Sequence, residues 1–125
     1  MASLSDIQKP VAAEMREFES YFRHTLHSDI PFFHVILSNF IRRKGKQMRP
    51  LLVFLTARLN GTVNETTFIA ATFIELLHTA TLVHDDVVDE ASERRGLPTI
   101  NVLYNSKIAV LVGDYLLAQG LLISV

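Results

Sequence analysis

Three aspartates, Asp85, Asp86 and Asp89, close an otherwise apolar stretch of the sequence. On an ideal helix they share one face, within about 100°, with His78 and Glu75. Carboxylates on consecutive turns repel one another unless cations compensate, and their hard oxygens suit Mg²⁺, which bridges protein carboxylates to substrate phosphates. Three acids at a helix C-terminus also oppose the helix macrodipole by roughly 0.3–1 kcal/mol each. Spacing alone favours a solvated helix end, because charge runs usually lie in water, but the cost against the macrodipole shifts the interpretation toward a Mg²⁺–diphosphate site.

Basic residues lie on both sides of this acidic face in the sequence. Lys46 and Arg49 precede it by one expected helix, and Arg94 and Arg95 follow it by one loop. Arginine binds phosphate oxygens through a bidentate fork, and lysine binds them as a point charge. Taken alone, such residues are more often surface charges. Flanking a metal-binding face, they indicate that two diphosphates bind rather than one.

The elements that must position these groups are expected to be helices, since strand signals are weak throughout. Proline and capping residues mark the starts, and Gly45 and Gly61 mark two of the ends. The expected helices are Ser5 or Asp6 to Leu26, Pro31 to an end at Gly45, Arg49 to Asn60, Glu65 to Asp89 after an Asn64 cap, and two shorter segments at 99–104 and 107–125. The fold class predicted is all-α, a helical bundle or a piece of one.

Composition narrows the function classes. The chain has 125 residues, 49% of them hydrophobic, which predicts one domain with surfaces that need a partner. A net charge of −1 gives no field for nucleic acid, and the absence of cysteine excludes disulfides and thiolate chemistry. The apolar stretch 108–125 is interrupted by Asp114 and Gln119 and is shorter than the roughly 20 residues of a membrane span. We expect a buried helix there, no transmembrane segment, and a cytoplasmic protein.

Nothing at the C-terminal end resembles a helix stop signal, because no glycine, proline or basic turn follows the last apolar residues. We therefore expect the chain to be truncated.

Three ordered segments resemble motifs of the trans-prenyl diphosphate synthase family. Residues 45–50, Gly-Lys-Gln-Met-Arg-Pro, resemble its Gly-Lys-x-x-Arg-Pro motif, and residues 75–89 resemble its first aspartate-rich helix. Residues 94–96, Arg-Arg-Gly, resemble the arginine pair that follows. One Asp-Asp-x-x-Asp is a weak pattern, but three motifs in order at compatible separations are a strong one.

The resemblance implies a role for each matching residue. It implies that Asp85, Asp86 and Asp89 hold Mg²⁺ on an allylic diphosphate, which Arg94 also contacts. Isopentenyl diphosphate would be bound by four further residues, Lys46, Arg49, His78 and Arg95. The implied fold is a helical bundle of the isoprenoid synthase type, of which residues 1–125 would be the N-terminal portion of a single domain. The implied assembly is a homodimer.

The implied reaction ionises the allylic C–O bond, adds the isopentenyl double bond and then loses a proton. The protein's main contribution would be electrostatic stabilisation of the departing diphosphate. In the family, bulky residues four and five positions before the first aspartate close the product tunnel. Here Thr81 and Ala80 stand there, so the sequence resembles long-chain polyprenyl members. Two departures are Gln47, where a basic residue is common, and the lack of a second aspartate-rich motif.

Three other functions are compatible with parts of the pattern. The chain could be a non-catalytic half-site or regulatory fragment that binds diphosphate or a partner through residues 108–125. A class I terpene cyclase also uses an aspartate-rich helix with Mg²⁺, but it needs no site for a second substrate. A di-iron bundle needs two Glu-x-x-His pairs, and only Glu75 and His78 have that spacing.

Overall fold

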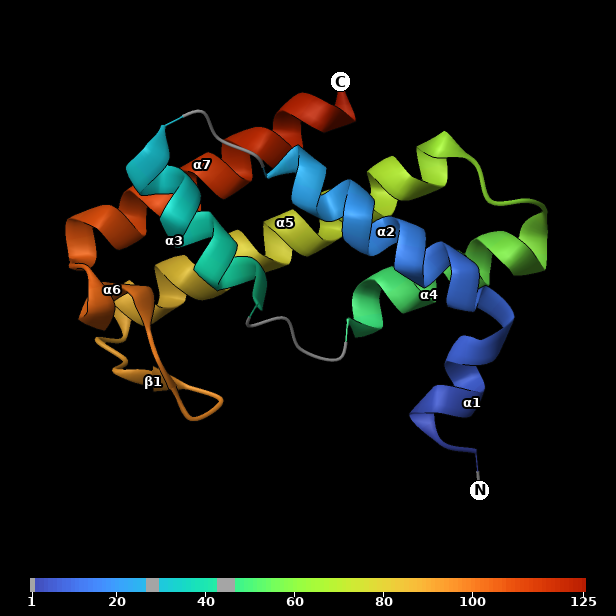
Figure 1. The fold of residues 1–125 in the computed structure, drawn as a ribbon, viewed down its shortest axis with the longest axis horizontal. Coiled ribbons are helices and arrows are strands. Elements are labelled where there is room, and N and C mark those ends of the chain that lie inside the picture. Colours follow the sequence, from blue (N-terminus) through green and yellow to red (C-terminus); the bar gives the residue numbers. More distant parts are fainter. Residues whose placement is uncertain (1, 27–29, 43–46) are drawn as a thin grey trace. The chain divides into compact units, whose positions relative to one another are not determined.

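The computed structural model describes residues 2–26, 30–42 and 47–125, with backbone alone for residues 40–42. The all-α prediction is confirmed, since the described elements are helices apart from one very short hairpin. In chain order they are α1 (Leu4–Gln8), the 3₁₀ helix η1 (Lys9–Val11), α2 (Ala12–Thr25), α3 (Pro31–Arg42), α4 (Met48–Asn60), α5 (Glu65–Val88), β1 (Glu93–Arg94), β2 (Leu97–Pro98), α6 (Ile100–Leu103) and α7 (Ser106–Ser124) (Figure 1). The chain forms two compact units, Met1–Glu75 and Leu76–Ile123, and α5 contributes to both.

The N-terminal segment differs from the single helix expected between Ser5 or Asp6 and Leu26. Ser3 is the N-cap, and its side chain and that of Asp6 each accept a hydrogen bond from the other residue's backbone N–H. The chain then passes through η1, which carries Pro10, before α2 begins. Proline has no N–H to donate and its ring clashes with the preceding turn, so the helix is broken there.

The first unit is built around an aromatic core. Phe18 of α2 and Phe54 of α4 are fully buried, with ring centroids 5.9 Å apart, and Phe68 of α5 lies 5.0 Å from Phe54. Val11 and Leu51 are buried in the same cluster. Burial of such large apolar side chains is the main source of stability in a small helical unit.

The second unit is formed by the later half of α5, the hairpin, α6 and α7. Its buried apolar residues come from all three helices: Leu76, Ala80, Val83, Ile100, Ala109, Val112 and Leu116. The Asn105 side chain caps α7 by accepting a hydrogen bond from the backbone N–H of Ile108 at 2.8 Å. This unit contains most of the residues to which the sequence assigns chemistry.

Helices α5 and α7 are both long and apolar enough to cross a membrane. Their most apolar 18-residue windows have mean hydropathies of 1.4 and 1.5, and 33% and 28% of those windows are buried. Length and hydropathy do not separate a membrane span from the core helix of a globular protein. The expected lack of a transmembrane segment therefore stays a prediction.

Candidate functional site

The acidic face lies at the C-terminal end of α5. The backbone N–H of Asp89 donates to the carbonyl of Asp85 at 2.8 Å, which continues the helical turn one residue past Val88. Asp85 and Asp89 are therefore on the same side of the chain, one turn apart, and both are exposed. Asp86 is different, with only 7% of its surface exposed. Only one of the three carboxylates is thus directed inward.

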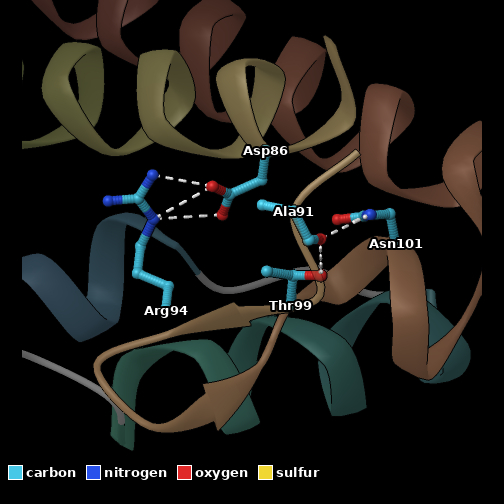
Figure 2. Close-up of polar contacts among 5 residues, drawn as sticks. All are labelled: Asp86, Ala91, Arg94, Thr99 and Asn101. Carbon is cyan, nitrogen blue, oxygen red and sulfur yellow. Dashed lines mark hydrogen bonds and ion pairs between the residues drawn. The ribbon is translucent and has the colours of Figure 1, made fainter. Parts of the chain in front are cut away.

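Asp86 is neutralised by Arg94 of β1 (Figure 2). The Arg94 Nε donates to both carboxylate oxygens at 3.1 Å, and its Nη2 donates to Oδ1 at 2.7 Å. The hydrogen bond to Asp86 raises the pKa of Arg94 above its ordinary value. A buried carboxylate is costly unless it is paired and hydrogen-bonded, and this fork supplies both conditions.

The segment between α5 and β1 closes the helix and is itself anchored. Glu90 takes a left-handed conformation with φ 55°, its N–H donates to the Val87 carbonyl, and the Ala91 N–H donates to the Asp86 carbonyl at 2.9 Å. This pattern is a Schellman motif without the usual glycine. The carbonyl of Ala91 then accepts from the side chains of Thr99 at 2.9 Å and Asn101 at 3.1 Å (Figure 2).

The second arginine lies at the tip of the hairpin. Glu93 pairs with Pro98 and Arg94 with Leu97, which leaves a two-residue turn of Arg95 and Gly96. Both turn residues have positive φ, 55° and 76°, as a tight type I′ hairpin turn requires. Arg95 is exposed there, while Arg94 reaches back to Asp86. The turn therefore places the two arginines of the motif in different surroundings.

Backbone strain is concentrated beside the motifs. Among the residues that the structure describes, the non-glycine positions with positive φ are Gln47, Glu90 and Arg95. Gln47 lies inside the Gly-Lys-x-x-Arg-Pro segment, Glu90 directly follows the aspartates, and Arg95 belongs to the arginine pair. Left-handed conformations cost energy for residues with a side chain and persist where the surroundings or the function require them.

The other predicted binding residues are distributed over both units. His78 is half-buried on α5 in the second unit. Arg49 is exposed on α4 in the first unit, where it lines an open groove of about 620 Å³ between α4 and α5 with Leu52, Ala70 and Ile74 among its neighbours. Lys46 lies outside the described residues.

The two residues predicted to set chain length differ in burial. Ala80 is 2% exposed, whereas Thr81 is exposed and donates its hydroxyl proton to the carbonyl of Leu77 at 2.8 Å. Leu77, one turn earlier, is 41% exposed. Thr81 and Leu77 therefore form the accessible side of this part of α5, and Ala80 belongs to the packed side.

The described residues contain no group of three or more His, Asp or Glu side chains arranged to hold a metal ion. Magnesium does not require one, because it usually keeps several waters and binds through one or two carboxylates together with substrate phosphates. Asp85 and Asp89 are two exposed carboxylates one turn apart, and their donor chemistry fits such a shared site. Both oxygens of Asp86 accept hydrogen bonds from Arg94, so its assignment as a ligand stays a prediction.

Sequence reasoning missed Thr99 and Asn101, which hold the loop that carries Arg94. Thr99 is buried, and one donor from each side chain goes to the same carbonyl. A threonine two residues before an asparagine has no distinctive spacing, so only the folded loop identifies them. Thr99 directly follows Pro98, but the apolar Ile100 separates it from Asn101, so no run of polar residues marked the pair.

The sequence matches a known family over most of its length. The family described as polyprenyl synthetase matches residues 31–124. An all-trans-nonaprenyl-diphosphate synthase of Rhodobacter capsulatus, described as geranyl-diphosphate specific, is 41% identical over 116 residues, which are 92% of this chain and 36% of that protein.

Solved structures give the same result. A decaprenyl diphosphate synthase from Rhodobacter capsulatus superposes with a TM-score of 0.89 at 37% identity, covering 97% of this chain and 38% of that one. A polyprenyl synthase from Caulobacter crescentus, complexed with calcium and isoprenyl diphosphate, also has a TM-score of 0.89, at 32% identity, covering 98% of this chain and 37% of that one. The helical bundle is thus of the isoprenyl synthase type, and the chain spans about a third of the length of these relatives.

Proposed function

The chain belongs to the polyprenyl synthetase family, and from this membership we propose that it forms the allylic-diphosphate half of a trans-prenyltransferase site. The reaction proposed is the condensation of isopentenyl diphosphate with an allylic diphosphate. The observation that carries the proposal is the division of the acidic turn: Asp85 and Asp89 are exposed together, while Asp86 is buried against Arg94.

In this proposal Asp85 and Asp89 hold Mg²⁺ against the allylic diphosphate. The ion would supply positive charge where negative charge develops on the leaving diphosphate. The protein's own work is to hold these two carboxylates on one turn and to bring a guanidinium beside them. Arg94 is tied to Asp86, so its position is fixed before substrate arrives, and such preorganised charge is the most effective kind. Asp86 then acts as the anchor of Arg94.

The isopentenyl diphosphate site is proposed to use Arg49, His78, Arg95 and Lys46. Support comes from the exposed guanidinium of Arg95 at the hairpin tip and from Arg49, which is the charged residue among those lining the α4–α5 groove. Phosphate groups need cationic donors and prenyl groups need apolar walls, and this groove offers both chemistries.

Binding is the direct test, because it does not depend on turnover. Calorimetric titration of the 125-residue chain with geranyl diphosphate should show affinity that requires Mg²⁺. Asp85→Asn should remove the Mg²⁺-dependent part, while Glu17→Gln, which changes an exposed acid on α2, should leave it intact. Equal binding by Asp85→Asn and the wild-type chain would reject the metal assignment.

Addition of isopentenyl diphosphate to the same samples distinguishes a working synthase from a half-site that binds substrate without turnover. Formation of a longer prenyl diphosphate supports a working synthase. Metal-dependent binding without product supports the half-site alternative, in which catalysis needs further residues. The chain covers 36% of the nonaprenyl synthase to which it is similar, so activity of the whole enzyme is a proposal for this chain.

Long-chain specificity is also part of the proposal, and the exposed side of α5 supports it. Thr81 is small and Leu77 is accessible, which leaves room along this side for an extended prenyl group. Thr81→Phe should weaken the binding of geranylgeranyl diphosphate more than that of geranyl diphosphate. An equal effect on the two ligands would remove the chain-length argument. Ala80→Phe is a poorer probe, because Ala80 is buried and the larger ring would overpack the unit.

A homodimer remains part of the proposal on the strength of the family resemblance, and a cytoplasmic location remains an expectation from the sequence. Size-exclusion chromatography with light scattering would test the first.

A further inference from the structure

His84, which directly precedes the aspartates, lies against α7. Its Nε2 is 3.1 Å from Oδ1 of Asp114 and 3.4 Å from the backbone carbonyl of Val110. The side chain is only one-third exposed. Nε2 of His84 therefore faces two acceptors on α7. These contacts with α7, rather than contacts within α5, orient the ring.

Gly113 creates the space for this ring. It is buried in the middle of α7, and a Cβ atom built on it would overlap both Nε2 and Cδ2 of His84. Glycine is a poor residue for a helix interior, because it costs more backbone entropy than alanine. Its presence at the one point where the imidazole crosses α7 means that the helix backbone itself forms the surface on which the ring rests.

The contact of the His84 ring with α7 and the Asp86–Arg94 ion pair lie on either side of Asp85 in the sequence. His84 fixes the turn just before Asp85, and Asp86 fixes it just after. Within the part of the chain that the structure describes, the exposed carboxylates of Asp85 and Asp89 have no comparable hydrogen bond, so their positions depend on the backbone that carries them. A binding constellation is productive only when its groups are held within about 0.5 Å of the required geometry.

We propose that His84 is a positioning residue for the metal-binding turn, and that Gly113 and Asp114 of α7 form the cradle that holds it. The inference rests on the proposed function, in which Asp85 and Asp89 bind the metal. His84 touches neither metal nor substrate. Its role is to keep the end of α5 in one rotational setting, in the way that outer hydrogen-bond partners orient metal ligands in other proteins.

The positioning role of His84 does not depend on a strong ion pair with Asp114. Asp114 is 59% exposed, and an ion pair at such a position contributes little to stability. The close approach of ring and glycine restricts the imidazole laterally, and the hydrogen bond selects its orientation. The two effects together make the position specific, which predicts a larger change in metal affinity than in folding.

The test is the affinity of the 125-residue chain for Mn²⁺ in the presence of pyrophosphate, followed by the electron paramagnetic resonance signal of free Mn²⁺. Gly113→Ala pushes the ring out of its cradle, and His84→Phe keeps an aromatic ring without its hydrogen bond. Each should weaken Mn²⁺ binding by about 10-fold, the lower end of the range for outer-sphere partners of metal ligands. His84→Gln can still donate to Asp114 and should restore most of the affinity. The line shape of bound Mn²⁺ should change in the first two variants and return in the third.

Asp85→Asn separates this inference from the proposed function. If Asp85→Asn leaves Mn²⁺ affinity unchanged, the proposed function fails. If Asp85→Asn removes binding while Gly113→Ala and His84→Phe bind normally, the positioning role is overturned and the proposed function stands. Circular dichroism gives the remaining outcome: loss of helical signal in both variants would make His84 a residue of folding stability, which also overturns the inference.

Discussion

The two ends of α5 are closed in different ways. At the N-terminal end, the Asn64 side chain accepts from the Thr67 N–H and the Thr67 hydroxyl oxygen accepts from the Asn64 N–H, both at 3.2 Å. At the C-terminal end, the Schellman motif places Glu90 in a left-handed conformation that suits glycine better. The first end follows the preferences of its residues, and the second departs from them.

The surroundings of the two ends explain the difference. The N-terminal half of α5 packs Phe68 and Ala71 into an aromatic core, where contacts are apolar and non-directional. The C-terminal end is held by directed hydrogen bonds from Arg94, Thr99 and Asn101. Local strain tends to persist at functional sites because the surrounding structure over-determines them. The strained end is the one that carries the predicted metal ligands.

The largest effect is expected in the core beside the N-terminal half of α5. Phe54→Ala should lower the free energy of unfolding by about 3–5 kcal/mol, because it removes a fully buried ring and leaves a cavity. Urea denaturation measures the change. Leu59→Ala on the same helix is the matched control, since Leu59 is 87% exposed and should change stability by no more than about 0.5 kcal/mol. Similar losses from both variants would contradict the assigned core.

The next effect is expected at the C-terminal end. In a double-mutant cycle of Asp86→Asn and Arg94→Gln, we expect a coupling free energy of about 1–3 kcal/mol, because a mostly buried carboxylate loses its bidentate partner. The exposed pair of Arg23 and Glu19 on α2 is a matched control and should couple by less than about 0.5 kcal/mol. Equal coupling in the two pairs would mean that Asp86 is more accessible than the structure indicates.

The sequence predicted the helices well where local signals mark them. Gly61 ends α4 after Asn60, Asn64 caps α5, and Pro31 begins α3, as expected. These signals work because a cap or a breaker acts within one turn. The break at Pro10 was missed because the apolar spacing continues across it, and periodicity alone does not show where a helix is interrupted.

The site was predicted less completely than the fold. Helical geometry indicates that Asp85, Asp86 and Asp89 share a face, but it does not show which part of that face is covered. The burial of Asp86 depends on Arg94, and Arg94 reaches it only because a two-residue turn reverses the chain at Arg95. Glu93 and Arg94 have low strand preference, so no sequence pattern indicated this hairpin. The roles of the individual residues stay predictions.

A smaller effect is expected from the cap of α5. Asn64→Ala should lower the free energy of unfolding by about 1 kcal/mol, because the N–H of Thr67 loses its side-chain acceptor and keeps only the backbone carbonyl of residue 64. Thr62→Ala, an exposed change just before the cap, should have little effect. Thermal unfolding followed by circular dichroism is sensitive enough to separate the two. If Asn64→Gly is as damaging as Asn64→Ala, the capping role is wrong, since glycine is tolerated at an N-cap.

The smallest expected effect is an increase in stability at the C-terminal end of α5. It tests directly whether the backbone is strained at that end and not at the N-terminal end. Glu90→Gly should raise the free energy of unfolding by about 0.5–1 kcal/mol, because glycine adopts positive φ without a steric penalty and only part of that gain is offset by its greater entropy when unfolded. Glu90→Ala, which removes the carboxylate but retains Cβ, should leave stability nearly unchanged. If Glu90→Ala stabilises the chain as much as Glu90→Gly, repulsion from the neighbouring aspartates is the cause and not the backbone. A stabilised Glu90→Gly chain that binds Mn²⁺ and pyrophosphate less tightly would show that the left-handed turn is retained for the site it serves.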